Sequence, residues 1–223
     1  MATNANPSGT PHDRLIETLT ADLAPVHRLL APSIRALIWL ALVVAIALGL
    51  AAFTDLTAMW RRLTAEPDMW LAFIGSVGTA ILAALAAFQL SVPDRSRAWA
   101  LLPLPTLLLW LGASGAGCLR TTFVADTHAA DMDEARMCLT FIVGLSIPLS
   151  AVLFFMLRRA CPLQPGLTAM IGGLAAAAAA ATLLNFFHPY DTALLDLVVH
   201  IIAVSLVIAA SRAVASRALT PQT

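Results

Sequence analysis

Long apolar runs alternate with short polar connections after a polar N-terminal stretch that ends near Pro32. A helix needs about 20 mostly apolar residues to cross a bilayer. Six runs meet this requirement, at 36–54, 69–92, 98–119, 137–157, 168–187 and 193–211. The pattern therefore predicts an all-α, polytopic membrane protein with six transmembrane helices.

A second pattern precedes these runs and predicts a short amphipathic helix at about 13–30. Its apolar residues recur every three or four positions, which places them on one stripe, and Ile16 lies beside it. The stripe consists of Leu15, Leu19, Leu23, Val26 and Leu30. Pro25 is expected to end or kink the helix.

Two interpretations of this helix are open. Its leucines could lie in the surface of the bilayer, but such helices usually carry many basic residues on their polar face. Here Arg14 and Arg28 are offset by Asp13, Glu17 and Asp22. Alternatively, the apolar stripe could dock in a groove of a soluble partner.

Composition supports the membrane assignment. The chain is 60% hydrophobic and 12% charged, whereas a soluble domain carries about 25% charged residues. Its net charge of zero gives no reason to expect direct nucleic-acid binding. No catalytic or cofactor motif is recognisable, so we expect neither an enzyme nor a resident cofactor.

The arginines predict the orientation, because cytoplasmic loops are enriched in basic residues. With the N-terminus and C-terminus in the cytoplasm, nine arginines are inside, namely Arg14, Arg28, Arg35, Arg95, Arg97, Arg158, Arg159, Arg212 and Arg217. Four are outside, namely Arg61, Arg62, Arg120 and Arg136. We therefore expect a cytoplasmic segment at 1–32, a membrane bundle at 33–215 and a cytoplasmic tail at 216–223, in a bacterial inner membrane.

Features within the runs predict local structure. Pro103 and Pro105 should kink the third helix or make it start late. Gly172, Gly173 and the alanines at 175–181 should allow close helix packing in the fifth. The five tryptophans lie mostly near the ends of the runs, as in an interfacial aromatic belt.

Cys118 ends the third run and Cys138 begins the fourth, so both are expected at the outer face, where His188 follows the fifth run. These residues could converge there. Neighbouring thiols could form a disulfide in an oxidising compartment, thiolate and imidazole could bind a soft metal transiently, or both cysteines could be small buried hydrophobic residues. Cys161, in an inner loop, is expected to stay reduced.

Few polar side chains lie inside the runs, where they often mark a transport path. They are Gln89, Asn185, Asp196 and His200. Asp196 and His200 are four residues apart on one helix face, so they could form a hydrogen bond within the bundle or give a response to protons.

Several stretches together resemble the NrsF-like membrane anti-sigma factors, a family of six-span bacterial proteins. They are LIETLTADLAPVHRL at 15–29, LSVPDRSRAW at 90–99, LLLWLGASGAGCL at 107–119, RMC at 136–138 and RRACPLQPGLTAMIGGLAA at 158–176. The resemblance extends from about residue 15 to residue 215.

The resemblance implies that the segment at 15–29 sequesters an extracytoplasmic-function sigma factor. It also implies that cysteines at the outer face sense oxidants or heavy metals, after which the sigma factor is released. Cys138 matches one of these cysteines. The second precedes a proline in the last external loop, where this chain has His188 before Pro189. Cys118 could then be the redox partner of Cys138, Cys138 and His188 could bind a metal, or the signal could differ in this member.

We therefore predict a membrane-bound anti-sigma factor whose partners are a sigma factor and the lipid bilayer. Two alternatives remain: a small transporter or channel, and a structural membrane protein with a lipid-surface helix.

Overall fold

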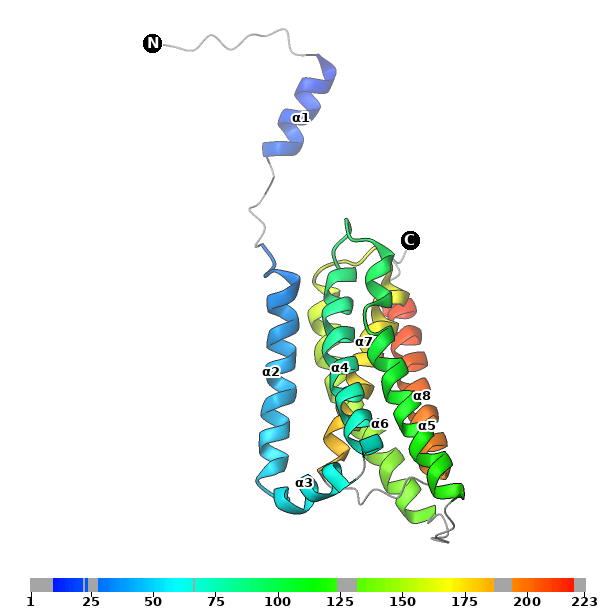
Figure 1. Cartoon of the computed structure of the whole chain (residues 1–223). Helices are drawn as coiled ribbons and strands as arrows, with labels where there is room; N and C mark the ends of the chain where they lie inside the picture. The colour runs from blue at the N-terminus through cyan, green and yellow to red at the C-terminus, as the bar shows by residue number, and fades with distance from the viewer. Residues whose placement is uncertain are drawn as a thin grey trace. The chain divides into compact units, whose positions relative to one another are not determined.

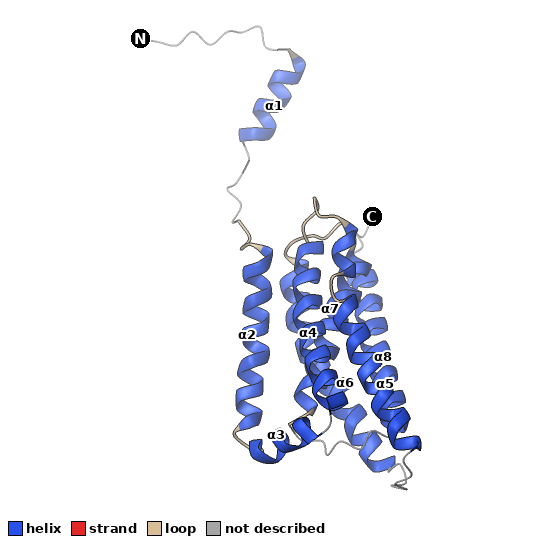
Figure 2. Ribbon diagram, viewed as in Figure 1, coloured by secondary structure: helices blue, strands red, loops and turns tan. Residues whose placement is uncertain are grey.

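The computed structural model describes residues 10–21, 23, 28–65, 67–123, 132–186 and 194–218. The chain divides into two compact units, Met1–Leu30 and Ala31–Thr223, which are described separately. All regular structure in the described residues is helical (Figure 2). Six helices are long and apolar enough to cross a membrane, which confirms the predicted fold class.

The first unit contains one described helix, α1 (Pro11–Ala21). Thr10 and Asp13 form a capping box: the Thr10 backbone N–H donates to Asp13 Oδ2 at 2.7 Å, and the Asp13 N–H donates to Thr10 Oγ1 at 3.4 Å. Pro11 follows the cap, at a position where its missing N–H has no cost.

The predicted helix at about 13–30 is too long. Leu23 and residues 28–30 are not helical, and Val26 lies outside the described residues. The sequence supplies the physical reason, because Pro25 has no N–H to donate and disfavours helical backbone in the residue before it.

The second unit contains the six long helices and two short ones. Its elements are α2 (Pro32–Ala51), α3 (Leu56–Ala65), α4 (Pro67–Leu90), the 3₁₀ helix η1 (Arg97–Leu101), α5 (Leu104–Phe123), α6 (Met132–Arg158), α7 (Pro165–Leu184) and α8 (Leu194–Ala218). Each of the six predicted runs overlaps one long helix. Helices α2, α4 and α7 begin two to four residues before the predicted runs, because each starts at a proline that hydropathy alone does not mark.

Two local features differ in how well the sequence anticipates them. The third transmembrane segment starts late, as its prolines predict: η1 precedes α5, and α5 begins between Pro103 and Pro105. Helix α3 is not anticipated at all, because its ten residues are too few to form a membrane-spanning run. We call the end of this unit at which α3 lies the α3 end, and the opposite end the Arg35 end (Figure 1).

Helix α7 is the most buried of the long helices and packs against α4, α6 and α8 (Figure 1). The predicted close packing of its small residues is confirmed. A Cβ atom added to Gly172 would lie 2.6 Å from Leu153 Cδ2, and one added to Gly173 would lie 2.7 Å from Ser211 Oγ. A side chain at Gly173 would push α8 away from α7, whereas a side chain at Gly172 would force the Leu153 side chain of α6 to move.

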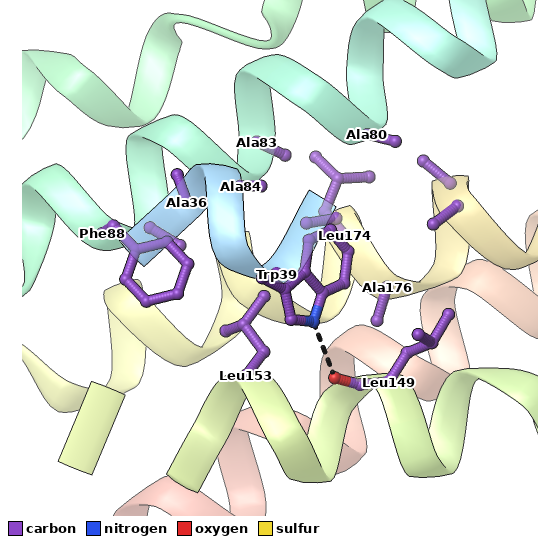
Figure 3. Close-up of a cluster of buried hydrophobic side chains, with 14 of the residues drawn as sticks. Ala36, Trp39, Ala80, Ala83, Ala84, Phe88, Leu149, Leu153, Leu174 and Ala176 are labelled. Carbon is purple, nitrogen blue, oxygen red and sulfur yellow. Dashed lines mark hydrogen bonds between the residues drawn. The ribbon is translucent and has the colours of Figure 1, made fainter. Parts of the chain in front are cut away.

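Trp39 fills the centre of a cluster formed by α2, α4, α6 and α7 (Figure 3). The side chain is fully buried, and its Nε1–H donates to the carbonyl oxygen of Leu149 at 3.1 Å. The expectation of an interfacial belt is therefore wrong for Trp39. A buried indole satisfies its single donor inside the protein, so it needs no headgroup region.

Candidate functional site

The first candidate site is the apolar stripe of α1. Leu15, Ile16 and Leu19 are 57%, 59% and 63% exposed, and α1 has no buried residue. Leu15 and Leu19 are one helical turn apart, so their side chains lie on the same face. A row of three large aliphatic side chains in water is unfavourable unless a partner or a bilayer covers it.

Other members of the predicted stripe are placed differently. Leu23 and Leu30 are exposed but lie outside α1, and Val26 is not among the described residues. The candidate binding surface is therefore the face of α1 with Leu15, Ile16 and Leu19, which we call the α1 stripe.

The polar face of α1 carries the carboxyl group of Asp13, which the capping box stabilises. Hydrogen bonds from Thr10, first from its side chain and then from its backbone, lower the pKa of the Asp13 carboxyl below 3.8. Glu17 is exposed one turn further along the helix. With exposed Arg14 beside these two carboxyl groups, the polar face lacks the excess of basic residues that helices on anionic membranes usually carry.

The second candidate site lies at the α3 end of the bundle, where α6 and α8 meet. Cys138 of α6 is 0% exposed, and its Sγ lies 3.6 Å from Nδ1 and 3.8 Å from Nε2 of His200 on α8. Small residues of α7 and α8, Ala180, Ala181 and Ala203, pack around this thiol. We call these two residues the Cys138–His200 pair.

This pairing was not predicted. Sequence reasoning grouped Cys138 with Cys118 and His188, but His188 lies outside the described residues. It paired His200 with Asp196, whose side chain is also outside them. One signal was available in retrospect: Cys138 and His200 both lie six residues after the start of their helices, and both helices start at the α3 end.

Thiol and imidazole in contact have a definite chemical capability. The imidazole can accept the thiol proton, which produces the thiolate that reacts with oxidants and soft metals. None of Cys118, Cys138 and Cys161 forms a disulfide. Among the described residues, no three His, Cys, Asp or Glu side chains are grouped so that they could hold a metal ion.

Cys118, near the end of α5, is buried and lines a cavity of about 250 Å³. His200, Asp68 and Ser114 line the same cavity. His200 therefore contacts Cys138 and also borders the cavity that Cys118 lines.

The third notable group is a buried cation at the Arg35 end. Arg35 of α2 is 5% exposed and donates to Ser91 Oγ at 3.4 Å and to the carbonyl oxygen of Met156. Its guanidinium also lies 5.0 Å from the ring centre of Phe88. Met156 is in the last turn of α6, where carbonyl groups lack partners within the helix, so Arg35 joins α2 to the end of α6.

A comparison with protein-family models assigns the chain to a family. The model for NrsF, described as negative regulator of sigma F, matches residues 19–220. The chain belongs to the NrsF family. The family is one of negative regulators of a sigma factor, and not a known class of enzymes.

The NrsF match begins at Leu19 in α1 and continues past the end of α8, so it includes the Cys138–His200 pair and the bundle. Comparisons with curated proteins and with solved structures give no match.

Proposed function

We propose that this NrsF-family chain is an inner-membrane anti-sigma factor that binds an extracytoplasmic-function sigma factor through the α1 stripe. The exposure of Leu15, Ile16 and Leu19 on an otherwise polar helix is the observation that carries this proposal. Burying a leucine or isoleucine side chain stabilises a complex by about 1.5–3 kcal/mol. Three such side chains in a groove are enough to dominate the binding free energy.

The distribution of arginines supports a cytoplasmic position for α1. Arg95, Arg158 and Arg212 lie at the Arg35 end of the bundle. The order of the helices along the chain predicts that nine of the thirteen arginines are on this side. By the positive-inside rule this end faces the cytoplasm, where RNA polymerase and its sigma factors are found. The α3 end, with the Cys138–His200 pair, then faces the envelope.

The Cys138–His200 pair is our candidate receiver of the envelope signal. An oxidant or a soft metal ion would react with the sulfur of Cys138 while His200 accepts its proton. This assignment replaces His188 with His200 as the partner of Cys138, on the basis of the 3.6 Å contact. Cys118 remains a further candidate, because it borders the same cavity as His200.

Helix α6 provides a physical connection from this pair to the N-terminal segment. It extends from Cys138 to Met156, about 27 Å at a rise of 1.5 Å per residue, and Met156 accepts a hydrogen bond from Arg35 near the start of α2. A displacement of α6 at one end would therefore shift α2, which follows the α1 segment in the sequence. Coupling of about 3 kcal/mol would change the affinity for the sigma factor roughly a hundredfold.

Binding can be tested with full-length protein in lipid nanodiscs and the host's purified extracytoplasmic-function sigma factors. The double variant Leu15→Gln/Leu19→Gln removes two apolar contacts, so we expect its Kd to rise by at least about a hundredfold. The matched control, Glu17→Gln/Ala21→Gln, places the same residue type on the opposite face of α1. Its Kd should stay close to that of the wild type.

If both double variants bind the sigma factor as the wild type does, the α1 stripe is not the binding surface. If the wild-type protein binds none of these sigma factors, the proposed function is wrong.

A further inference from the structure

We propose that the cavity between α4, α5, α7 and α8 is a binding site for one acyl chain of a membrane phospholipid. The cavity has a volume of about 250 Å³ and its walls are mostly apolar. Six of the side chains that define it are Leu107, Trp110, Leu111, Leu174, Val204 and Ile208. This inference concerns a ligand of the bundle and is independent of sigma-factor binding.

The cavity is too large to be a packing defect. A dry apolar cavity of about 150 Å³ in another protein is already large enough to bind benzene. Leaving 250 Å³ of apolar space empty would forfeit van der Waals contacts along four helices. Water needs several polar partners, so it is a poor occupant of the apolar part of the cavity, which Leu107, Leu174 and Val204 line.

The length of the cavity matches the thickness of the hydrocarbon layer that one leaflet of a bilayer contributes. Its lining residues on α8 extend from Leu197 to Ile208, which is about 16 Å along the helix axis. The hydrocarbon core of a bilayer is about 30 Å thick, so one leaflet contributes about 15 Å. An extended acyl chain that enters from the α3 end would therefore fill the cavity along its length.

The polar lining is concentrated where a lipid headgroup would be expected. Asp68, Cys118 and His200 line the cavity and lie near the α3 end of α4, α5 and α8. The residues that line it deeper in the bundle are mainly apolar, with Ser114 and Ser205 as exceptions. A chain with a polar head at one end matches this distribution better than a uniformly apolar molecule.

The cavity also opens towards the side of the bundle. Leu111 of α5 and Ile201 of α8 line it, yet they are exposed large hydrophobic residues. Helices α5 and α8 pack mainly against α4 and α7, and only slightly against each other. The gap between them faces the hydrocarbon of the membrane, which supplies acyl chains at very high local concentration.

Trp110 provides a reporter inside the cavity. The full-length protein is reconstituted in vesicles of phosphatidylcholine that carries bromine atoms midway along one acyl chain, and in unbrominated vesicles. Bromine quenches tryptophan fluorescence on contact. The difference between wild type and Trp110→Phe isolates the contribution of Trp110 from those of the other four tryptophans.

Ser114→Phe places a bulky side chain in the cavity, whereas Ala116→Phe places the same side chain on the exposed surface of α5. We expect Ser114→Phe to reduce quenching of Trp110 by about twofold or more, because the chain is displaced from its contact distance. Ala116→Phe should leave the quenching unchanged. If Ser114→Phe does not fold, Ser205→Phe and its control Ala210→Phe test the same cavity from α8.

Equal quenching in the cavity-filling and control variants would overturn the proposal. It would also be overturned if 1-bromonaphthalene in unbrominated vesicles quenched Trp110 in a Ser114-dependent way while the brominated lipid did not. That result would assign the cavity to a small aromatic molecule instead. Neither outcome depends on whether the protein binds a sigma factor.

Discussion

The two ends of the transmembrane bundle are built on different principles. At the Arg35 end, a buried cation contacts a hydroxyl group, a helix-terminal carbonyl group and an aromatic ring. At the α3 end, Cys138 and His200 meet as a thiol and an imidazole among small residues. A buried charge is costly to separate from its partners, whereas a thiol and an imidazole can exchange a proton. The first arrangement favours rigidity, and the second allows a chemical change.

This difference suggests a division of roles. The proposed function requires one region whose chemical state can change and a second region that transmits this change to the N-terminal segment. The Cys138–His200 pair is suited to the first role, and the Arg35 contacts with α6 are suited to the second. The comparison predicts large stability effects at the Arg35 end and small ones at the pair.

The largest effect is expected from Arg35→Ala. It leaves the partly buried carbonyl group of Met156 without the donor from α2 and removes the contact with Phe88. We expect the free energy of unfolding in mild detergent to fall by about 3 kcal/mol. Arg35→Lys keeps the positive charge but lacks the planar guanidinium group with its several donors. Its free energy of unfolding should therefore fall by about half as much. An unchanged free energy of unfolding in Arg35→Ala would contradict the proposal that the Arg35 contacts make this end rigid.

The substitution Gly75→Ala tests a tight contact between α4 and α5 inside the bundle, between its two ends. A Cβ atom at Gly75 would lie 2.7 Å from the backbone nitrogen of Trp110, so α4 and α5 would have to separate. We expect Gly75→Ala to destabilise the protein by about 2 kcal/mol.

Gly112 is the matched control, because nothing lies within 4 Å of an added Cβ there. Gly112→Ala should be neutral, or stabilising by up to about 1 kcal/mol through helix propensity. Equal effects of the two substitutions would contradict the close approach of α4 and α5 at Gly75.

The Cys138–His200 pair should matter more for signalling than for stability. Cys138→Ser and His200→Gln keep similar volumes, so each should change the unfolding free energy by less than about 1 kcal/mol. Both should weaken the release of the sigma factor by oxidants or soft metals, measured with the full-length protein in nanodiscs. Cys161→Ser is the control, since Cys161 is an exposed thiol at the other end of the bundle. A normal response in both variants would remove the pair from the mechanism.

The smallest effect concerns the capping box of α1. Because the pKa of Asp13 is lowered in the folded helix, its contribution is present above the ordinary pKa of the carboxyl group. That contribution is lost as the pH falls through the lowered value. NMR titration of the full-length protein should show this lowered pKa, and Thr10→Ala should raise it towards 3.8. An unchanged pKa in Thr10→Ala would show that the Thr10 side chain does not stabilise the carboxylate.

Particular residues show where sequence reasoning succeeds and where it does not. The late start of α5 follows from two prolines, and the close packing of α7 follows from its run of small residues. Apolar spacing alone predicts too long a helix, because the spacing continues past Pro25, although a proline has no N–H to donate to a helical hydrogen bond. Trp39 was assigned to an interface because it is near the start of a run, whereas its indole is buried against Leu149.

The sequence by itself determined the number of membrane-spanning helices, their approximate limits and the presence of an apolar stripe before them. These properties depend on local patterns, because a lipid-embedded helix must be long and apolar and a surface helix must be two-sided. Only the tertiary structure decided that Cys138 meets His200, that Arg35 caps the end of α6 and that α5 and α8 leave a cavity. The long helices are apolar on nearly all faces, so their sequences do not specify which face contacts which neighbour. That choice is made by side-chain packing between segments that are far apart in the chain.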